Sequence, residues 1–287
     1  MQPVTGVSPM TNQSEDRILN FDEAHWTAVA ANYERWAEPF TAQFARAALS
    51  LAGGVRHGER VLDVAAGTGA LSLAVAETGG SVLATDSSPA MVTRLRDRLQ
   101  PFAGCEARVM DGQALELEDA TFDTSFSVFG IMGFPNWQRG MTELVRVTQS
   151  GGRVIMVTWE NPEGAGPFPL FMQAYRHTFP NAAIPLPPPG MSVLCSPEAL
   201  KVEMVRAGCG EVAVHAINSD WSGPSVDRVM GDIDQILALH PLYAALDDDK
   251  RAQLRGPLRA AIEAYAEPGG AFQIPATANV AVGRKLC

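Results

Sequence analysis

The part of the chain best suited to ligand chemistry is a glycine loop that follows a short apolar run. The stretch reads Val61-Leu62-Asp63-Val64-Ala65-Ala66-Gly67-Thr68-Gly69, and helix-forming residues from Ala70 to Glu77 come directly after it. Glycine carries no Cβ and adopts positive φ easily, so such a loop lets a ligand approach the backbone closely. A tight strand-to-helix turn without a ligand is the alternative, because a lone G-x-G is a weak motif.

The acidic residue at the mouth of this loop, Asp63, separates two classes of ligand. The fingerprint of NAD(P) sites is G-x-G-x-x-G, or Ala at the third glycine, and this chain has Ser72 there. A carboxylate would repel the pyrophosphate of a dinucleotide, whereas it would attract the ammonium group of a methionine moiety. The loop therefore favours S-adenosylmethionine over NAD(P), although Asp63 could instead cap a neighbouring turn.

Two further acidic loops are expected at the same edge of the sheet. Asp86 ends the second predicted strand, where a carboxylate can accept hydrogen bonds from both ribose hydroxyls. Its alternative role is to cap the helix that begins near Pro89. Asp111-Gly112-Gln113-Ala114 follows the third strand, and an acid or amide there could read the adenine amino group. These loops indicate an adenosine pocket.

Together these motifs resemble those of the class I S-adenosylmethionine-dependent methyltransferases, in particular the subgroup typified by the ubiquinone and menaquinone biosynthesis enzymes. The resemblance covers about Tyr33 to Lys285, and it rests on the first loop, Asp86-Ser87-Ser88-Pro89-Ala90-Met91, Asp111-Gly112-Gln113-Ala114-Leu115 and Phe122-Asp123. It implies that the chain is a methyltransferase with S-adenosylmethionine as cofactor. By the same resemblance, the first loop holds the methionine part, Asp86 the ribose and Met91 the adenine, while Tyr33 closes over the methionine. The cofactor-binding residues expected are Tyr33, Asp63, Ala65, Gly67, Thr68, Gly69, Asp86, Ser87, Met91, Asp111, Gly112, Gln113, Ala114 and Phe129.

The segment from Phe129 to Trp137 follows the fourth predicted strand, where an acceptor should meet the methyl group. Methyltransferases that act on nucleobases or amides usually carry an Asn- or Asp-Pro-Pro-aromatic motif at this place, and Phe134-Pro135-Asn136 does not reproduce it. We therefore expect a small aromatic or heterocyclic acceptor in a largely apolar pocket, with the acceptor atom undetermined. The substrate-binding residues expected are Trp26, Ile131, Met132, Phe134, Trp159, Met172 and Tyr175, of which the later ones could equally form a second hydrophobic core.

Methyl transfer from a sulfonium is an in-line displacement, which needs alignment and exclusion of water more than a catalytic apparatus. A general base would help if the acceptor were a hydroxyl or an acidic carbon. Among the five histidines, His25 and His177 are the best placed for that role, with a structural role as the alternative for each. No metal site is expected, because the four cysteines are scattered without a C-x-x-C pair.

The elements that must position these residues alternate between strand and helix. The fold expected is α/β, a Rossmann-like doubly wound, mostly parallel seven-stranded sheet with N-terminal helices and helical cap insertions. The strands are predicted at 60–64, 81–85, 107–110, 124–129, 153–159, 211–218 and 278–283. The organisation expected is a flexible leader at 1–20, lid helices at 21–53, the cofactor-binding core at 54–160, a cap insertion at 161–195, a core helix and strand at 196–221, a second cap insertion at 222–270 and the last core strand at 271–287.

The formal charge of −10 argues against nucleic acid as a partner, since binding to phosphate backbones rests on clustered Lys and Arg. Neither a signal peptide nor a run of about 20 apolar residues is visible, so the chain is expected to be cytoplasmic and free of membrane. It should act on a small molecule as a monomer or homodimer. The competing hypotheses are a protein that binds S-adenosylmethionine without transferring its methyl group and, less favoured, an NAD(P)-dependent oxidoreductase.

Overall fold

A single seven-stranded sheet forms the centre of the protein, whose computed structural model describes residues 18–287. The strand order is β3-β2-β1-β4-β5-β7-β6. The first five strands pair in parallel, β7 runs antiparallel to β5, and β6 runs antiparallel to β7. This arrangement confirms the predicted fold class. The strands are β1 (Arg60–Val64), β2 (Ser81–Asp86), β3 (Glu106–Val109), β4 (Phe122–Val128), β5 (Thr148–Trp159), β6 (Cys209–Gly223) and β7 (Phe272–Lys285).

The helices of the core connect these strands and pack on the sheet. Most of them begin with a capping side chain or with a proline, which has no N–H to leave unpaired; Ser88 and Ser196, for instance, accept backbone N–H groups one turn on. The core helices are α3 (Ala70–Glu77), α4 (Pro89–Leu99), α5 (Trp137–Val147), α7 (Pro189–Leu194) and α8 (Pro197–Arg206), with a 3₁₀ turn, η3, at Ile131–Gly133.

The N-terminal helices form one nearly continuous rod that we call the lid. α1 (Glu23–Asn32) passes through a π-helical turn, η2 (Tyr33–Ala37), into α2 (Glu38–Leu51). Two helices were predicted here, and the π-turn between them was not. Such turns often occur at functional sites because they redirect side chains without ending the helix.

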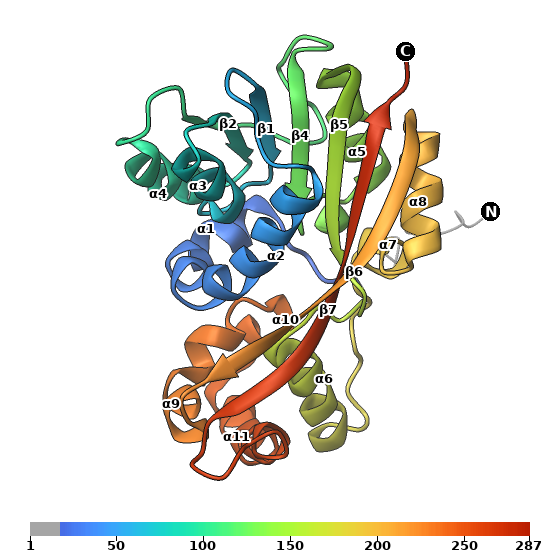
Figure 1. Cartoon of the computed structure of the whole chain (residues 1–287). Helices are drawn as coiled ribbons and strands as arrows, with labels where there is room; N and C mark the ends of the chain where they lie inside the picture. Colours follow the sequence, from blue (N-terminus) through green and yellow to red (C-terminus); the bar gives the residue numbers. More distant parts are fainter. Residues whose placement is uncertain (1–17) are drawn as a thin grey trace, which may run out of the picture.

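The outer halves of β6 and β7 form a two-stranded ribbon that leaves the core. They pair continuously from His215 with Val280 to Gly223 with Phe272, so both strands are longer than the sequence suggested. The added residues at the outer ends alternate between more buried and more exposed side chains, a pattern that polar residues such as Ser219 and Asp220 obscure in the sequence. Around this ribbon lie α6 (Pro167–Thr178), α9 (Val226–Leu237), α10 (Pro241–Ala244) and α11 (Asp248–Glu263), which we call the cap; it occupies the lower part of Figure 1.

The cap has its own apolar interior, which is continuous with that of the core. Phe171 and Tyr175 of α6 stack edge to face and are buried against the other cap helices. Met172 and Phe168 on the same helix line the cavity described below. One face of α6 therefore belongs to a hydrophobic core, as one of the two interpretations predicted, and the other face borders the cavity, where substrate binding stays a prediction. None of the helices between residues 18 and 287 has the length and apolar composition needed to cross a bilayer.

Candidate functional site

A cavity of about 760 Å³ lies where the strand-end loops of the core meet the lid and the cap. The core contributes the ends of β1, β2, β3, β4 and β5, as expected for an open parallel sheet. Its walls include these predicted residues: Trp26, Tyr33, Ala65, Gly67, Asp86, Ser87, Met91, Asp111, Gly112, Gln113, Phe129, Met132, Phe134, Trp159 and Met172. One end of the cavity is polar and acidic, and the rest is mostly apolar.

The glycine loop is held in conformations that side chains with a Cβ adopt at a cost. Gly67 and Gly69 have φ of +57° and +109°, and a Cβ on Gly69 would lie 2.4 Å from Leu95 Cδ1. Ala65, the first residue after β1, is also left-handed with φ of +58°. Facing it, a Cβ on Gly130 would lie 2.3 Å from that of Ala65. The backbones after β1 and β4 therefore approach each other as closely as glycine permits.

Asp86 ends β2, lines the cavity and joins the glycine loop to this strand. Its carboxylate accepts hydrogen bonds from the backbone N–H groups of Gly67 and Ser88, both at 2.9 Å. Burial raises the pKa of Asp86 above its usual value. The alternative role of Asp86 as helix cap is wrong, because the Ser88 hydroxyl caps α4 by accepting from Met91 N at 3.2 Å. The Asp86 carboxylate instead fixes the backbone of the two loops while it lines the cavity.

Asp63 lies beneath the loop rather than in the cavity lining. The Ser72 hydroxyl donates to its Oδ2 at 2.7 Å, whereas its buried Oδ1 has no partner among the described residues. Burial, together with the nearby charge of Asp86, raises the pKa of Asp63 to about 7. Two carboxylates thus share one poorly solvated region, which favours a cation beside them.

Thr68 is fixed by two residues that sequence reasoning did not identify. Its hydroxyl donates to the Glu38 carboxylate at the start of α2, and its carbonyl accepts from Arg98 of α4 at 2.8 Å. Arg98 also makes a two-pronged ion pair with Glu38, at 2.6 and 2.7 Å. Thr68 is fully buried and does not line the cavity, so its contacts join the loop to the lid and to α4. Apart from the presence of an acidic residue, Glu38, before the loop, nothing in the sequence indicated these contacts.

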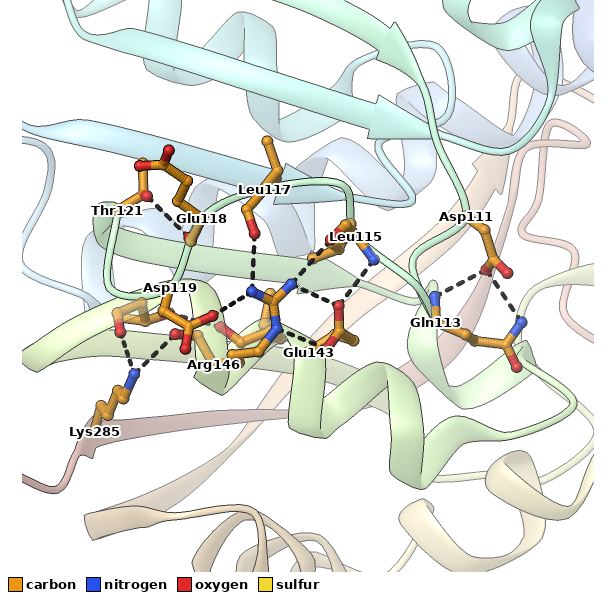
Figure 2. A network of polar contacts seen from close by, with 12 residues as sticks. Asp111, Gln113, Leu115, Leu117, Glu118, Asp119, Thr121, Glu143, Arg146 and Lys285 are labelled. Carbon is orange, nitrogen blue, oxygen red and sulfur yellow. Dashed lines mark hydrogen bonds and ion pairs between the residues drawn. The ribbon is translucent and has the colours of Figure 1, made fainter.

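The loop after β3 forms the next wall and is braced from outside. Gln113 donates to Asp111 Oδ1 at 3.2 Å and accepts from Asn136 N at 2.8 Å, so its amide is already engaged. Ala114 lies outside the lining of the cavity. Figure 2 shows the brace, in which Arg146 joins Glu143 to the carbonyl groups of Leu115 and Leu117. Asp111, whose Oδ1 accepts from both Gln113 N and Gln113 Nε2, is the carboxylate that this loop contributes to the cavity wall.

The lid covers the acidic end of the cavity. Tyr33, at the start of the π-turn, lies over the glycine loop, so that a Cβ on Gly67 would be 3.4 Å from its ring. Burial raises the pKa of Tyr33 to about 12, which keeps the phenol neutral. The lid is joined to α4 by the Thr27–Ser88 hydrogen bond at 2.9 Å and by the Arg94–Glu34 ion pair at 2.5 Å.

Aromatic rings form the centre of the cavity, next to the glycine loop. Phe129, the first residue after β4, has φ of +59° and stacks on Trp159 with ring centroids 3.7 Å apart. Phe40 of the lid stacks on the other side of Trp159 at 5.7 Å. Of the predicted substrate residues, Phe134 packs over Gly112 and so walls the loop after β3, whereas Ile131 and Tyr175 are buried outside the lining.

The two histidines predicted to be catalytic do not line the cavity. His177 is exposed on the outer face of α6. His25 Nε2 lies 3.1 Å from the Leu239 carbonyl, so His25 joins the lid to the α9–α10 turn. The histidine that lines the cavity is His240, which follows Leu239 and is 4% exposed. Among the described residues, no three His, Cys, Asp or Glu side chains gather in a way that could hold a metal ion.

Comparison with known proteins is consistent with this geometry. Residues 62–156 match the model of a methyltransferase domain. An uncharacterised protein of Mycobacterium tuberculosis is 37% identical over 141 residues, 49% of this chain and 50% of that protein. The chain is thus aligned with about half the length of the first relatives that it matches. A demethylmenaquinone methyltransferase of Beutenbergia cavernae is 33% identical over 191 residues, which make up 65% of this chain and 74% of that enzyme.

The fold is shared with solved methyltransferase structures. A structure described as a methyltransferase from Bacillus halodurans aligns with a TM-score of 0.56 at 17% identity, covering 85% of this chain and 99% of that one. An identity of 17% shows only that the fold is shared, whereas the identity of 33% to the Beutenbergia enzyme shows membership of the same family. Together with the methyltransferase domain match and the acidic glycine-loop site, this establishes that the chain belongs to the class I S-adenosylmethionine-dependent methyltransferases.

Proposed function

We propose that the chain binds S-adenosylmethionine at the acidic end of the cavity and transfers its methyl group to a small, largely apolar aromatic or heterocyclic molecule beneath the cap. The observation that carries this proposal is the division of one cavity into two environments. The carboxylates of Asp86 and Asp111 lie at one end, and the rings of Phe129, Trp159 and Phe168 line the other part. The volume of about 760 Å³ lies within the range of about 300–1,000 Å³ typical of small-molecule sites.

The residues at the acidic end fit the proposed cofactor. Asp86 would hold the ribose and Asp111 the adenine amino group, while Met91 packs on the base. The unpartnered Oδ1 of Asp63 fits a positive charge near the glycine loop, such as the ammonium of a methionine moiety. The cofactor would supply an electrophilic methyl group on a positively charged sulfur.

The chain's own contribution to the chemistry is electrostatic and geometric. Carboxylates near the sulfur would favour the cation over bulk water. The lid and the cap exclude water from the path between acceptor and methyl group. Alignment of the two molecules beneath the rings of Phe129 and Trp159 would supply most of the acceleration.

The test is calorimetric titration of extensively dialysed protein with S-adenosylmethionine, S-adenosylhomocysteine and NADH in parallel. We expect both adenosyl ligands to bind with dissociation constants in the micromolar range, and NADH not to bind. Binding of NADH alone would overturn the assignment of the loop. A panel of phenols, heterocyclic amines and quinone precursors then tests the acceptor, with S-adenosylhomocysteine formation as the signal. Failure of the whole panel would contradict the proposed acceptor class. The small-molecule partner, the monomeric or homodimeric state and the cytoplasmic location stay predictions.

A further inference from the structure

His240 is a buried polar side chain that no contact within the described residues explains. It lies in the turn between α9 and α10, is 4% exposed and lines the cavity. Its Nδ1 is buried without a hydrogen-bond partner among the described residues. A buried imidazole nitrogen without a partner destabilises a protein, so its presence needs another explanation.

The surroundings of this imidazole are apolar rings. Phe171 and Phe168 of the cap have ring centroids 5.2 and 5.7 Å from that of His240, and Phe21 beside the lid is at 6.2 Å. Burial there, with a smaller effect of nearby His25, lowers the pKa of His240 to about 4, so the ring is neutral at pH 7. A neutral imidazole can accept one hydrogen bond and donate another, but it does not attract a carboxylate as a cation would.

The position of the ring is set by the residue that precedes it. His25 of the lid contacts the Leu239 carbonyl at 3.1 Å, which joins the backbone of this turn to α1. From Phe21 the rings continue to Trp26 at 5.7 Å and then to Tyr33 at 5.9 Å, which covers the glycine loop. His240 and the proposed methionine site therefore border the same aromatic-walled space. Glu163 and Arg176, the charged cap residues in the lining, are already paired with each other.

We infer that His240 is the polar group that receives the acceptor, that the acceptor is a neutral aromatic or alicyclic alcohol, phenol or enol, and that its hydroxyl donates a hydrogen bond to the imidazole. This inference rests on the proposed function. As the O–C bond forms and the C–S bond breaks, the sulfur keeps the electron pair and the hydroxyl proton passes to His240. The positive charge lost by the sulfonium is thereby gained by the imidazolium, which then releases its proton to solvent.

A weak base is sufficient for this step. The acidity of a hydroxyl rises steeply once its oxygen begins to bond to carbon, so proton transfer late in the displacement needs no strong base. A thiol acceptor, which ionises at neutral pH far more easily than an alcohol, would need no base at all. The comparison between a hydroxyl and a thiol of the same shape therefore isolates the contribution of His240.

The experiment compares wild type, His240→Phe and His240→Gln, with His57→Phe, in an exposed turn, as the matched control. Binding of 2-naphthol and of 2-methoxynaphthalene is titrated in the presence of S-adenosylhomocysteine, and methylation of 2-naphthol and 2-naphthalenethiol is followed as S-adenosylhomocysteine formed. We expect His240→Phe to bind naphthol at least tenfold more weakly but the ether equally well. It should methylate naphthol at least a hundredfold more slowly and the thiol less than threefold more slowly, with partial rescue of binding in His240→Gln.

Thermal unfolding separates this role from a structural one, because the two roles predict opposite changes in the melting temperature of His240→Phe. If His240 serves the acceptor, His240→Phe raises the melting temperature, because a phenyl ring suits this apolar site better than an unpartnered imidazole. A lower melting temperature with equal losses for naphthol and the thiol would overturn the inference. The inference would also be overturned if the wild type bound S-adenosylhomocysteine but methylated only amines. The proposed function would stand in that case. If the wild type binds no adenosyl ligand, the proposed function itself fails.

Discussion

Two buried carboxylates dominate the chemistry of individual residues in this protein. Asp63 and Asp86 lie close enough for the charge of one to raise the pKa of the other, and neither has a basic side chain as its hydrogen-bond partner. Their burial disfavours the charged forms in the free protein, and a cation bound beside them, as proposed above, would offset this cost.

Replacement of Asp86 tests the ribose assignment. We expect Asp86→Ala to weaken binding of S-adenosylhomocysteine by more than about 1 kcal/mol, because charge-assisted hydrogen bonds to the ribose hydroxyls are lost. Calorimetric titration measures this change. The matched control is Asp97→Ala, which removes an exposed carboxylate from α4 and should leave affinity unchanged. Equal affinities in a correctly folded Asp86→Ala would show that the ribose lies elsewhere.

The pKa of about 7 for Asp63 predicts a pH dependence of cofactor binding. Below that value the carboxyl is protonated, and it must lose a proton to face an ammonium group. The affinity for S-adenosylhomocysteine should therefore rise with pH up to about 7 and then level off. Titrations between pH 5.5 and 8.5 in buffers of different ionisation enthalpy should detect proton release on the acidic side. In Asp63→Asn this release and the dependence should disappear; an unchanged profile would assign it to another group.

The same shift makes a prediction about the stability of the free protein. The folded-state pKa of Asp63 is raised above the value of about 3.9 expected in the unfolded chain. The unfolded state therefore loses its proton first as pH rises, and the contribution of Asp63 becomes unfavourable between about 4 and 7 and stays so above 7. Asp63→Asn should thus be more stable than wild type in urea unfolding at pH 8, with a smaller difference at pH 5. A less stable variant at pH 8 would contradict this account.

The sequence placed residues near strand ends in the cavity wall correctly, but it did not place residues that only tertiary packing brings there. Gly67, Asp86 and Asp111 lie at the end of a strand or within three residues of it, so position in the chain determines where they lie. His240, which precedes Pro241 in the second predicted insertion, was not among the histidines preferred from sequence. The rings around it come from Phe168, Phe171 and Phe21, all distant in the chain. His25 and His177 were preferred for their neighbourhoods in sequence, and the packing turned both away from the cavity.

At the scale of elements, the lid is held to the core by α4. Glu34 and Glu38 lie one turn apart on the lid, and they pair with Arg94 and Arg98, which lie one turn apart on α4. The first pair is partly exposed, and the second is more deeply buried and also holds Thr68. The two pairs therefore share geometry but differ in burial, which makes each a control for the other.

The deeper pair should matter far more than the outer one. We expect Arg98→Gln to lower the free energy of unfolding by about 2 kcal/mol, because Glu38 loses its partner in a buried place and the glycine loop loses a brace. Arg94→Gln should cost less than about 1 kcal/mol, as exposed pairs do. Urea unfolding measures both. Affinity for S-adenosylhomocysteine should fall in the first variant only; equal effects of the two substitutions would show that the buried pair does not hold the loop.

The elements of the core were predictable because short apolar runs typical of strands alternate there with helix-forming segments. In the cap and the ribbon, these sequence patterns were weaker. β6 and β7 gain their outer halves from pairing with each other, which a single segment does not reveal. Tertiary pairing there overrides local propensity.

At the scale of the whole molecule, the lid and the cap close the cavity from two sides and touch each other through His25 and Leu239. A ligand that fills the acidic end would contact the lid first. We expect S-adenosylhomocysteine to slow amide hydrogen exchange throughout α1, η2 and the α9–α10 turn. α8, which packs on the far strands β6 and β7, should be unaffected and serves as the internal control. Protection confined to the strand-end loops, with none in the lid, would show that the lid does not respond to the cofactor.

The separation of the ribbon-borne cap from the strand-end loops has a consequence for how such proteins diverge. Residues 62–156, which match the shared methyltransferase domain, contain the glycine loop, Asp86 and Asp111, whereas His240 and the cap helices all come later in the chain. Mutations that reshape the cap therefore leave the cofactor residues intact. Related proteins can therefore change their acceptor specificity through substitutions in the cap while the methyl donor stays the same. Kinship in the first half of the chain consequently carries little information about the acceptor, and a guess at the acceptor is better taken from the cap.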